Sequence, residues 1–137
     1  ERTRDDMMIQ NSTILLIEEE PVLREITAFR LELLGYRVVT KMTASEASIA
    51  LQGELPHLIA VGNVAEMESI EFLNHLSNDP RTSGLPVIYL SGSSDLEEVQ
   101  RAYNAGADEF LVTPFDPSVL ERKVEGLLHA ASQQGAK

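Results

Sequence analysis

The chain has 137 residues, of which 43% are hydrophobic and 24% charged, with a net charge of −11 and no cysteine. This length fits one domain with a full core, and the lack of cysteine excludes a disulfide framework and a thiolate metal site. The acidic charge argues against nucleic-acid binding, and no apolar run approaches the roughly 18 residues of a membrane span. We therefore expect a cytoplasmic globular domain without nucleic-acid or membrane partners.

The chain opens with a polar, aperiodic segment, residues 1–12, which predicts a disordered lead-in. The apolar run 13–17 then has the length of a strand and ends in three glutamates. A helix is expected to begin at Pro21 and to end at Gly35, because proline suits the first helical position and glycine the position after the last. Its apolar residues have i, i+4, i+7 spacing, which predicts one apolar face of the kind that packs on a core. The residues of that face are Val22, Ile26, Phe29 and Leu33.

The run 58–62 reads as a strand buried on both faces, because all of its residues are apolar. Such a strand lies in the middle of a sheet. Capping boxes at Thr43 with Glu46 and at Ser94 with Glu97 predict two helix starts. The other expected elements are strands over 36–40, 86–90 and 107–112, helices over 66–77 and from Asp116-Pro117, and a flexible tail over 132–137.

Five strands alternate with five helices in this prediction. That rhythm is typical of an α/β fold with three layers, a doubly wound five-stranded parallel sheet with helices on both faces. The carboxyl ends of such strands meet at one crevice, where these folds bind ligands. The residues placed there are Glu18, Glu19, Gly62, Ser91 and Thr113.

Three motifs of the sequence resemble the receiver domains of two-component response regulators, which have the CheY-like, flavodoxin-type fold. They are Ile-Leu-Leu-Ile-Glu-Glu-Glu-Pro (14–21), Asn-Asp-Pro-Arg-Thr-Ser-Gly-Leu-Pro-Val-Ile (78–88) and Gly-Ala-Asp-Glu-Phe-Leu-Val-Thr-Pro-Phe-Asp-Pro (106–117). The resemblance covers residues 13–131, which we expect to form one receiver-like domain. It also implies that the Thr113-Pro114 peptide bond is cis.

Active members of that family accept a phosphoryl group on an aspartate after the third strand, beside an acidic pair that holds Mg²⁺, a hydroxyl and a lysine. The resemblance places the acceptor at Gly62, which has no side chain and cannot act as a nucleophile. The acidic pair falls on Glu18 and Glu19, whose extra methylene is expected to carry each carboxylate outward. Mg²⁺ demands near-octahedral geometry, so these two glutamates are weak metal candidates and no cofactor is expected. Ser91 keeps the hydroxyl position, whereas Thr113 replaces the lysine.

The resemblance therefore predicts a vestigial pocket and an atypical, phosphorylation-independent receiver that acts in a phosphorelay by protein–protein interaction, not an enzyme. Ser91 and Phe110 occupy the positions of the family's conformational switch. The alternative is a flavodoxin-like module that binds a ligand or nucleotide in the acidic crevice, although three glutamates would repel phosphate there. A conventional phosphoacceptor is excluded at residue 62.

The expected partner is a protein of the signalling pathway or an output domain in the same chain, and a homodimer is possible. The face that family members use for such contacts carries charges of both signs here, which could pair across a two-fold axis. Its candidate interface residues are Arg101, Asp108, Glu109, Arg122 and Lys123.

Overall fold

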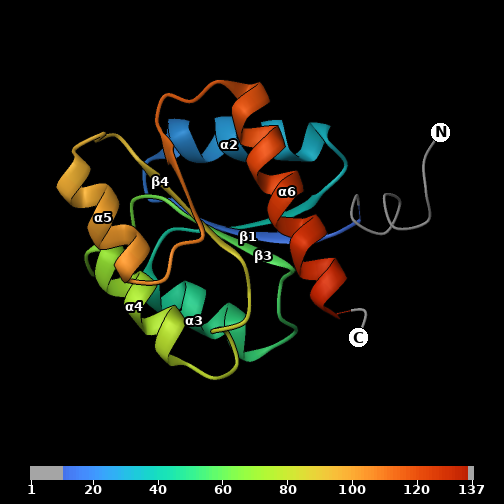
Figure 1. The fold of residues 1–137 in the computed structure, drawn as a ribbon, viewed down its shortest axis with the longest axis horizontal. Helices are drawn as coiled ribbons and strands as arrows, with labels where there is room; N and C mark the ends of the chain where they lie inside the picture. The colour runs from blue at the N-terminus through green and yellow to red at the C-terminus, as the bar shows by residue number, and fades with distance from the viewer. Residues whose placement is uncertain (1–10, 136–137) are drawn as a thin grey trace.

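The computed structural model describes residues 11–135. A five-stranded parallel sheet with strand order β2-β1-β3-β4-β5 lies at its centre (Figure 1). The strands are β1 (Thr13–Ile17), β2 (Arg37–Lys41), β3 (Leu58–Val61), β4 (Val87–Ser91) and β5 (Glu109–Val112).

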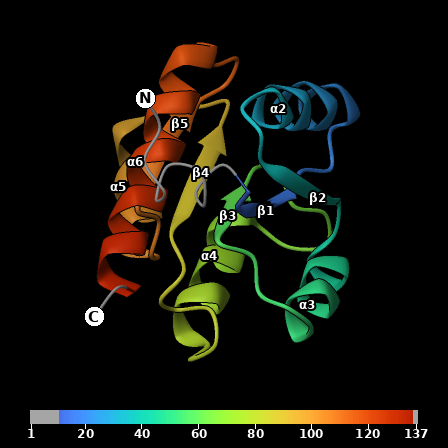
Figure 2. The same cartoon turned by 90° about the vertical axis from the view of Figure 1, so that its right-hand side faces the viewer.

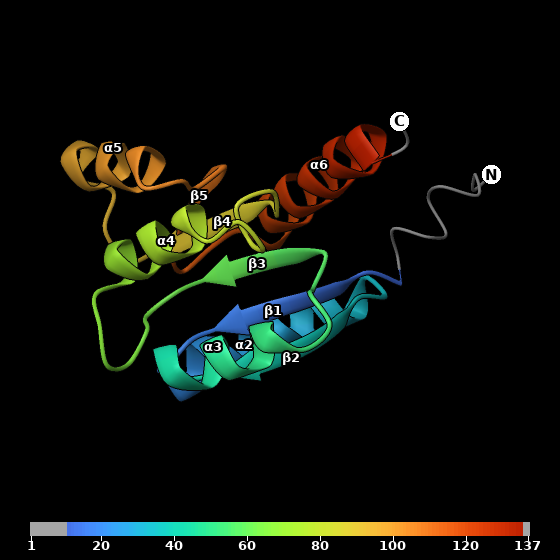
Figure 3. The ribbon, with the colours of Figure 1, turned by 90° about the horizontal axis from the view of Figure 1, so that it is seen from below.

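Helices cover both faces of this sheet. One face carries α2 and α6, and the other carries α3, α4 and α5 (Figures 1 and 2). The helices are α2 (Pro21–Leu33), α3 (Ala44–Gln52), α4 (Ser69–Asn78), α5 (Leu96–Asn104) and α6 (Pro117–Gly135). The three layers are seen in another direction in Figure 3. The predicted three-layer, doubly wound α/β fold is confirmed.

The central strand β3 is buried on both faces, as its composition predicts, because its side chains alternate between two core clusters. Ile59 and Val61 pack with the cluster under α3, α4 and α5. Leu58 and Ala60 pack with the cluster under α2 and α6. Val61 pairs with Ile17 of β1 on one side and with Tyr89 of β4 on the other, and this register places Gly62 at the carboxyl edge of the sheet.

The prediction of which side of α2 packs on the core is wrong. Val22, Ile26, Phe29 and Leu33 are between 49% and 60% exposed. The residues of α2 that are buried are Thr27 and Leu31. A second apolar set on the same helix therefore faces the sheet, and the predicted face is turned toward solvent.

Most of the predicted helix ends are confirmed by their capping contacts. The Thr43 hydroxyl accepts a hydrogen bond from the Glu46 amide at 2.9 Å, and Gly35 and Gly106 adopt φ values of 99° and 116°. Both glycines follow helices in the left-handed region that a side chain disfavours. The capping box at Ser94 is wrong, because Asp95 caps α5 by accepting a hydrogen bond from the Glu97 amide at 3.1 Å.

The ends of the chain differ in part from the prediction. Helix α6 continues to Gly135, so residues 132–135 are helical where a flexible tail was expected. Gly126 lies within this helix, and no proline or glycine follows it until Gly135. Nothing in the sequence between these two residues therefore ends the helix. Ser12 is buried, and its carbonyl accepts a hydrogen bond from the Arg37 amide. Most of the predicted lead-in, residues 1–10, and the last two residues lie outside the described part of the chain.

Candidate functional site

The residues selected from the sequence gather at the carboxyl edge of the sheet. Gly62 follows β3, whose neighbours are β1 and β4, and Ser91 ends β4 beside Val112 of β5. The Thr113 amide donates a hydrogen bond to the Ser91 carbonyl at 2.8 Å, which holds the ends of β4 and β5 together. The strand register therefore places the glutamates, Gly62, Ser91 and Thr113 along one edge.

The central feature of this edge is the close approach of Glu18 to Gly62. A Cβ atom on residue 62 would overlap the Glu18 Oε1 atom and would lie 3.0 Å from its Cδ atom. The backbone of Gly62 does not explain the glycine, since its φ lies outside the left-handed region. The Glu18 carboxylate thus takes the space in which a side chain of residue 62 would begin.

The Glu18 side chain is held inward by three N–H donors. Its Oε1 atom accepts a hydrogen bond from the Asn63 amide at 3.2 Å, and its Oε2 atom accepts from the Asn63 Nδ2 atom at 2.8 Å and the Glu20 amide at 3.0 Å. The residue is only 2% exposed. The extra methylene was expected to displace the Glu18 carboxylate outward, whereas it lets the carboxylate reach over Gly62 into a buried position.

The loop after β3 is also fixed by polar contacts. The Ser69 hydroxyl donates to the Gly62 carbonyl at 2.6 Å, and the Gly62 amide donates to the Ile17 carbonyl at 2.8 Å. The Glu19 side chain is exposed, and its amide donates to the Asn63 carbonyl at 2.7 Å. The two glutamates of the predicted pair thus lie in different environments, one buried and one in solvent. Within residues 11–135, no group of three His, Cys, Asp or Glu side chains is placed to hold a metal ion.

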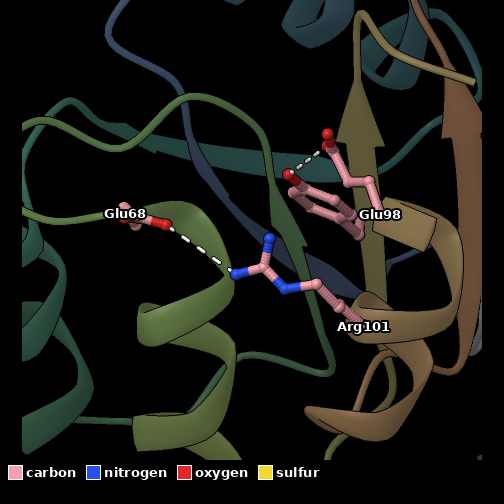
Figure 4. A network of polar contacts seen from close by, with 4 residues as sticks. Glu68, Glu98 and Arg101 are labelled. Atoms are coloured by element: carbon pink, nitrogen blue, oxygen red, sulfur yellow. Dashed lines mark hydrogen bonds and ion pairs between the residues drawn. The ribbon is translucent and has the colours of Figure 1, made fainter. Parts of the chain in front are cut away.

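The Ser91 hydroxyl is bound to Glu98 of α5. Ser91 donates to the Glu98 Oε2 atom at 2.6 Å and accepts a hydrogen bond from the Ser93 amide at 3.1 Å. The Tyr89 hydroxyl donates to the same Glu98 oxygen at 3.0 Å, and Figure 4 shows this contact from close by. The single proton of the Ser91 hydroxyl is therefore already committed to a carboxylate of the chain itself.

Phe110, the second residue of the predicted switch, is connected to this network through an aromatic contact. Its ring meets the Tyr89 ring edge-on, with centroids 5.7 Å apart and an interplanar angle of 69°. Phe110 is half-buried against the core under α3, α4 and α5. The Thr113-Pro114 bond that follows β5 is cis, which confirms that prediction.

Glu98, Tyr89 and Asn63 are participants that sequence reasoning missed. Tyr89 lies two residues before Ser91 on the same strand, so alternation along β4 could have placed both side chains on one face. Asn63 directly follows Gly62. Glu98 had no comparable signal, because its position depends on how the turn 92–95 directs α5 back toward β4.

Burial first, and then the hydrogen bond and negative charge of Glu98, raise the pKa of Tyr89 to about 12. We expect Glu98→Gln to lower this pKa, since it removes the charge that opposes tyrosinate formation. The measurement is an alkaline titration followed by tyrosinate absorbance. Glu97→Gln, which removes one charge from the exposed neighbouring position, is the matched control and should leave the curve unchanged. Equal curves for Glu98→Gln and wild type would show that Glu98 does not act on Tyr89.

The same shift has a consequence for stability. A tyrosine in the unfolded chain ionises near 10.0, whereas Tyr36 and Tyr89 keep their protons in the folded state up to about 12. Between these values the folded state binds more protons than the unfolded state, so the free energy of unfolding falls as the pH rises. Below pH 10 the two protonated tyrosines make their full contribution to the free energy of unfolding.

Four of the five candidate interface residues already have partners within the domain. The Lys123 ammonium donates to the Glu109 carboxylate at 2.6 Å, and Val87 donates its amide to the Asp108 carboxylate at 2.8 Å. Arg101 lies 4.0 Å from Glu68 in an exposed ion pair, seen in Figure 4. Arg122, the fifth, is exposed on α6. Their role in an interface stays a prediction.

A family model for the response regulator receiver domain matches residues 14–125. The chain belongs to this family. The receiver is similar to response regulator Rre1 of Synechocystis sp., with 33% identity over 135 residues that cover 95% of the receiver and 58% of Rre1. It is also 31% identical over 122 residues to the phosphate regulon transcriptional regulatory protein PhoB of Rhizobium meliloti, covering 88% of the receiver and 54% of PhoB. The receiver thus spans little more than half the length of these curated relatives.

Solved structures agree with this assignment. The signal receiver domain of a histidine kinase from Syntrophus aciditrophicus is 31% identical with a TM-score of 0.80, covering 87% of this receiver and 91% of that chain. A CheY-like receiver domain protein from Methanospirillum hungatei has a TM-score of 0.82 at 26% identity, covering 90% and 98%. Among residues 11–135, no helix of the receiver has the length and apolar character needed to cross a membrane.

Proposed function

We propose that this receiver works in two-component phosphorelay signalling without accepting a phosphoryl group, and that it acts by protein–protein contact. The observation that carries the proposal is the place of the Glu18 carboxylate at Gly62. A receiver that accepts phosphate needs a carboxylate on residue 62 with free space around it. Here the residue offers no nucleophile, and a buried anion of the chain fills the space beside it.

The electrostatics of the edge support the same proposal. Both oxygens of the Glu18 carboxylate already accept N–H donors. Mg²⁺ takes hard oxygen ligands in a near-octahedral arrangement, and neither Gly62 nor the exposed Glu19 adds a fixed ligand beside Glu18. These residues do not fit the metal that the fold family uses, so the proposal includes no metal and no other cofactor.

The proposed resting state of the switch is also independent of phosphate. In a phosphorylated receiver, the hydroxyl after the fourth strand would turn toward the new phosphoryl oxygens. The Ser91 hydroxyl is instead bound to Glu98, and residue 113 is a threonine rather than a cation. A nucleotide or another phosphate ligand would meet repulsion from the acidic residues 18–20.

The partner we propose is a cytoplasmic signalling protein or an output domain of the same polypeptide. The receiver spans 58% of Rre1 and 54% of PhoB, so each relative is longer than this domain. We propose a role by contact and not by catalysis, because the edge where active receivers do chemistry is filled by the chain itself.

The proposal is tested with beryllium fluoride, a stable analogue of a phosphoryl group on a carboxylate. Two-dimensional amide NMR spectra of the receiver are recorded with Mg²⁺ alone and with Mg²⁺ and beryllium fluoride. We expect the Gly62, Ser91 and Thr113 amide signals to stay in place. Saturable shifts of these three signals that require both beryllium and Mg²⁺ would overturn the proposal.

A further inference from the structure

The outer side of α2 is an apolar stripe with nothing of the described chain packed on it. Four large side chains form this stripe at positions 22, 26, 29 and 33, each about half exposed or more. A continuous patch of this kind is rare on the surface of a monomer and marks a site of association. The stripe is straight along the helix, because residues three and four apart lie on one side.

The stripe is directed away from the domain. Successive residues of a helix are about 100° apart around its axis, so Leu31 lies about 160° from Phe29. Leu31 is fully buried in the core between α2 and the sheet. The stripe therefore faces outward, on the side of α2 that no other helix or strand covers in Figure 2.

The spacing of the stripe is that of a coiled-coil seam. Intervals of four, three and four residues correspond to heptad positions d, a, d and a. In this heptad, Glu25 and Glu32 are g positions on one side of the stripe, and Arg30 is an e position on the other. Glu25 and Arg30 are exposed, and neither forms an ion pair within residues 11–135.

These flanking charges favour a second copy of the receiver as the partner that packs on the stripe. In a parallel pair of helices, a g residue meets the e residue five positions later on the partner helix. Glu25 of each copy would then meet Arg30 of the other copy, and the two-fold axis would make both contacts equal. In an antiparallel pair, g positions meet g positions, and the glutamates of the two copies would repel each other.

We infer that the α2 stripe is the interface of a homodimer in which the α2 helices of two receivers pack in parallel as a short coiled coil. The helices are already formed in each folded domain, so association carries no entropy cost for ordering their backbones. Two heptads bury a small area, and interfaces below about 1,200 Å² belong to weak, reversible complexes. The inferred dimer is therefore concentration-dependent.

Sedimentation velocity over about 5 to 500 µM receiver measures the dimer directly, because mass action shifts the population over this range. We expect the weight-average sedimentation coefficient to rise with concentration. Ile26→Glu should weaken the dimer at least tenfold, because it places two carboxylates in the seam. Ile49→Glu is the matched control, since Ile49 is 67% exposed on α3, and it should behave as wild type. A receiver that stays monomeric to the highest concentration overturns the inference, as does equal weakening by both variants.

A charge swap tests the parallel orientation. Glu25→Arg and Arg30→Glu should each weaken the dimer about threefold or more, and the double variant should recover the wild-type constant, since it exchanges the two sides of each ion pair. Loss in the double variant as large as the sum of the two single losses would contradict a Glu25–Arg30 contact across the axis.

A cysteine scan gives a covalent readout, because the chain has no cysteine of its own. In a parallel pair, residue 29 of one copy lies beside residue 29 of the other. Phe29→Cys should therefore form a disulfide-linked dimer under mild oxidation, whereas Ile49→Cys should not. Equal cross-linking of both variants would mean random collision, and no cross-linking of Phe29→Cys at concentrations where the dimer forms would exclude the parallel seam.

Discussion

Gly62→Ala is expected to lower the free energy of unfolding of this receiver by about 2–4 kcal/mol. A glycine with an ordinary φ usually gains about 0.4–1 kcal/mol when alanine replaces it, because the unfolded chain loses freedom. The opposite sign is expected here, since a Cβ at residue 62 would overlap the Glu18 Oε1 atom. The buried carboxylate would have to move and give up hydrogen bonds, each of which stabilises a charged group by about 1.5–3 kcal/mol. Urea denaturation measures the change.

Two further variants separate this cause from a general intolerance of the edge. Gly92→Ala is the matched control, because a Cβ on residue 92 would meet Thr113 Oγ1 only at 3.9 Å. It should leave stability within about 0.5 kcal/mol of wild type. In a Glu18→Ala background, Gly62→Ala should lose most of its cost, which a double-mutant cycle reports as a coupling of about 1–3 kcal/mol. Additive effects of the two substitutions would show that Glu18 is not the obstacle at residue 62.

The second large effect concerns phosphoryl acceptance when the missing groups are restored. Gly62→Asp with Thr113→Lys supplies the nucleophile and the cation but should accept phosphate only weakly, because Glu18 still fills the space and Glu19 is unchanged. Adding Glu18→Asp and Glu19→Asp shortens both side chains and should raise the phosphorylated fraction at least tenfold. Intact-mass spectrometry after incubation with acetyl phosphate and Mg²⁺ gives the fraction. Circular dichroism checks that each variant is folded.

The result that would contradict this expectation is equal phosphorylation of the double and quadruple variants. In that case the inward position of Glu18 would not limit access to residue 62. The shortening of the side chains at residues 18 and 19 would then have no effect on phosphorylation.

The fold could be predicted from the sequence because the three central strands, β1, β3 and β4, are short and strongly apolar runs. Leu58 to Val61 is the best example, since a segment without polar side chains belongs in the interior of a sheet covered by helices on both faces. The bounds of β1 were predicted without error, whereas those of β2, β4 and β5 were displaced by one or two residues at one or both ends, where pattern reasoning is least exact.

The face of α2 that packs on the sheet could not be predicted from the apolar pattern of the helix. The helix carries two apolar sets, one at 22, 26, 29 and 33 and another that includes Leu23 and Leu31. Periodicity identifies an apolar face but gives no information on which of two such faces packs on the sheet. The choice is made by tertiary contacts with Tyr36 and the strands, which bury Leu31 and Thr27.

The structure brings the candidate residues together at the strand ends, where the sequence placed them, but their contacts were not predictable. The longer side chain was expected to carry the Glu18 carboxylate outward by about one bond, but the glycine at residue 62 leaves an internal space that this carboxylate fills. The N–H groups of Asn63 and Glu20 supply the donors that make its burial tolerable. The glycine after β3 and the glutamate after β1 thus act together, and no single motif shows this coupling.

The central claim, that this receiver does not accept a phosphoryl group, is tested most directly by intact-mass spectrometry of the unmodified chain. The receiver is incubated with acetyl phosphate and Mg²⁺, with the quadruple variant in parallel as the positive control. We predict that the wild-type mass stays unchanged while the control gains about 80 Da, the mass of one phosphoryl group on a carboxylate. A Mg²⁺-dependent gain of about 80 Da on the wild-type chain would contradict the account.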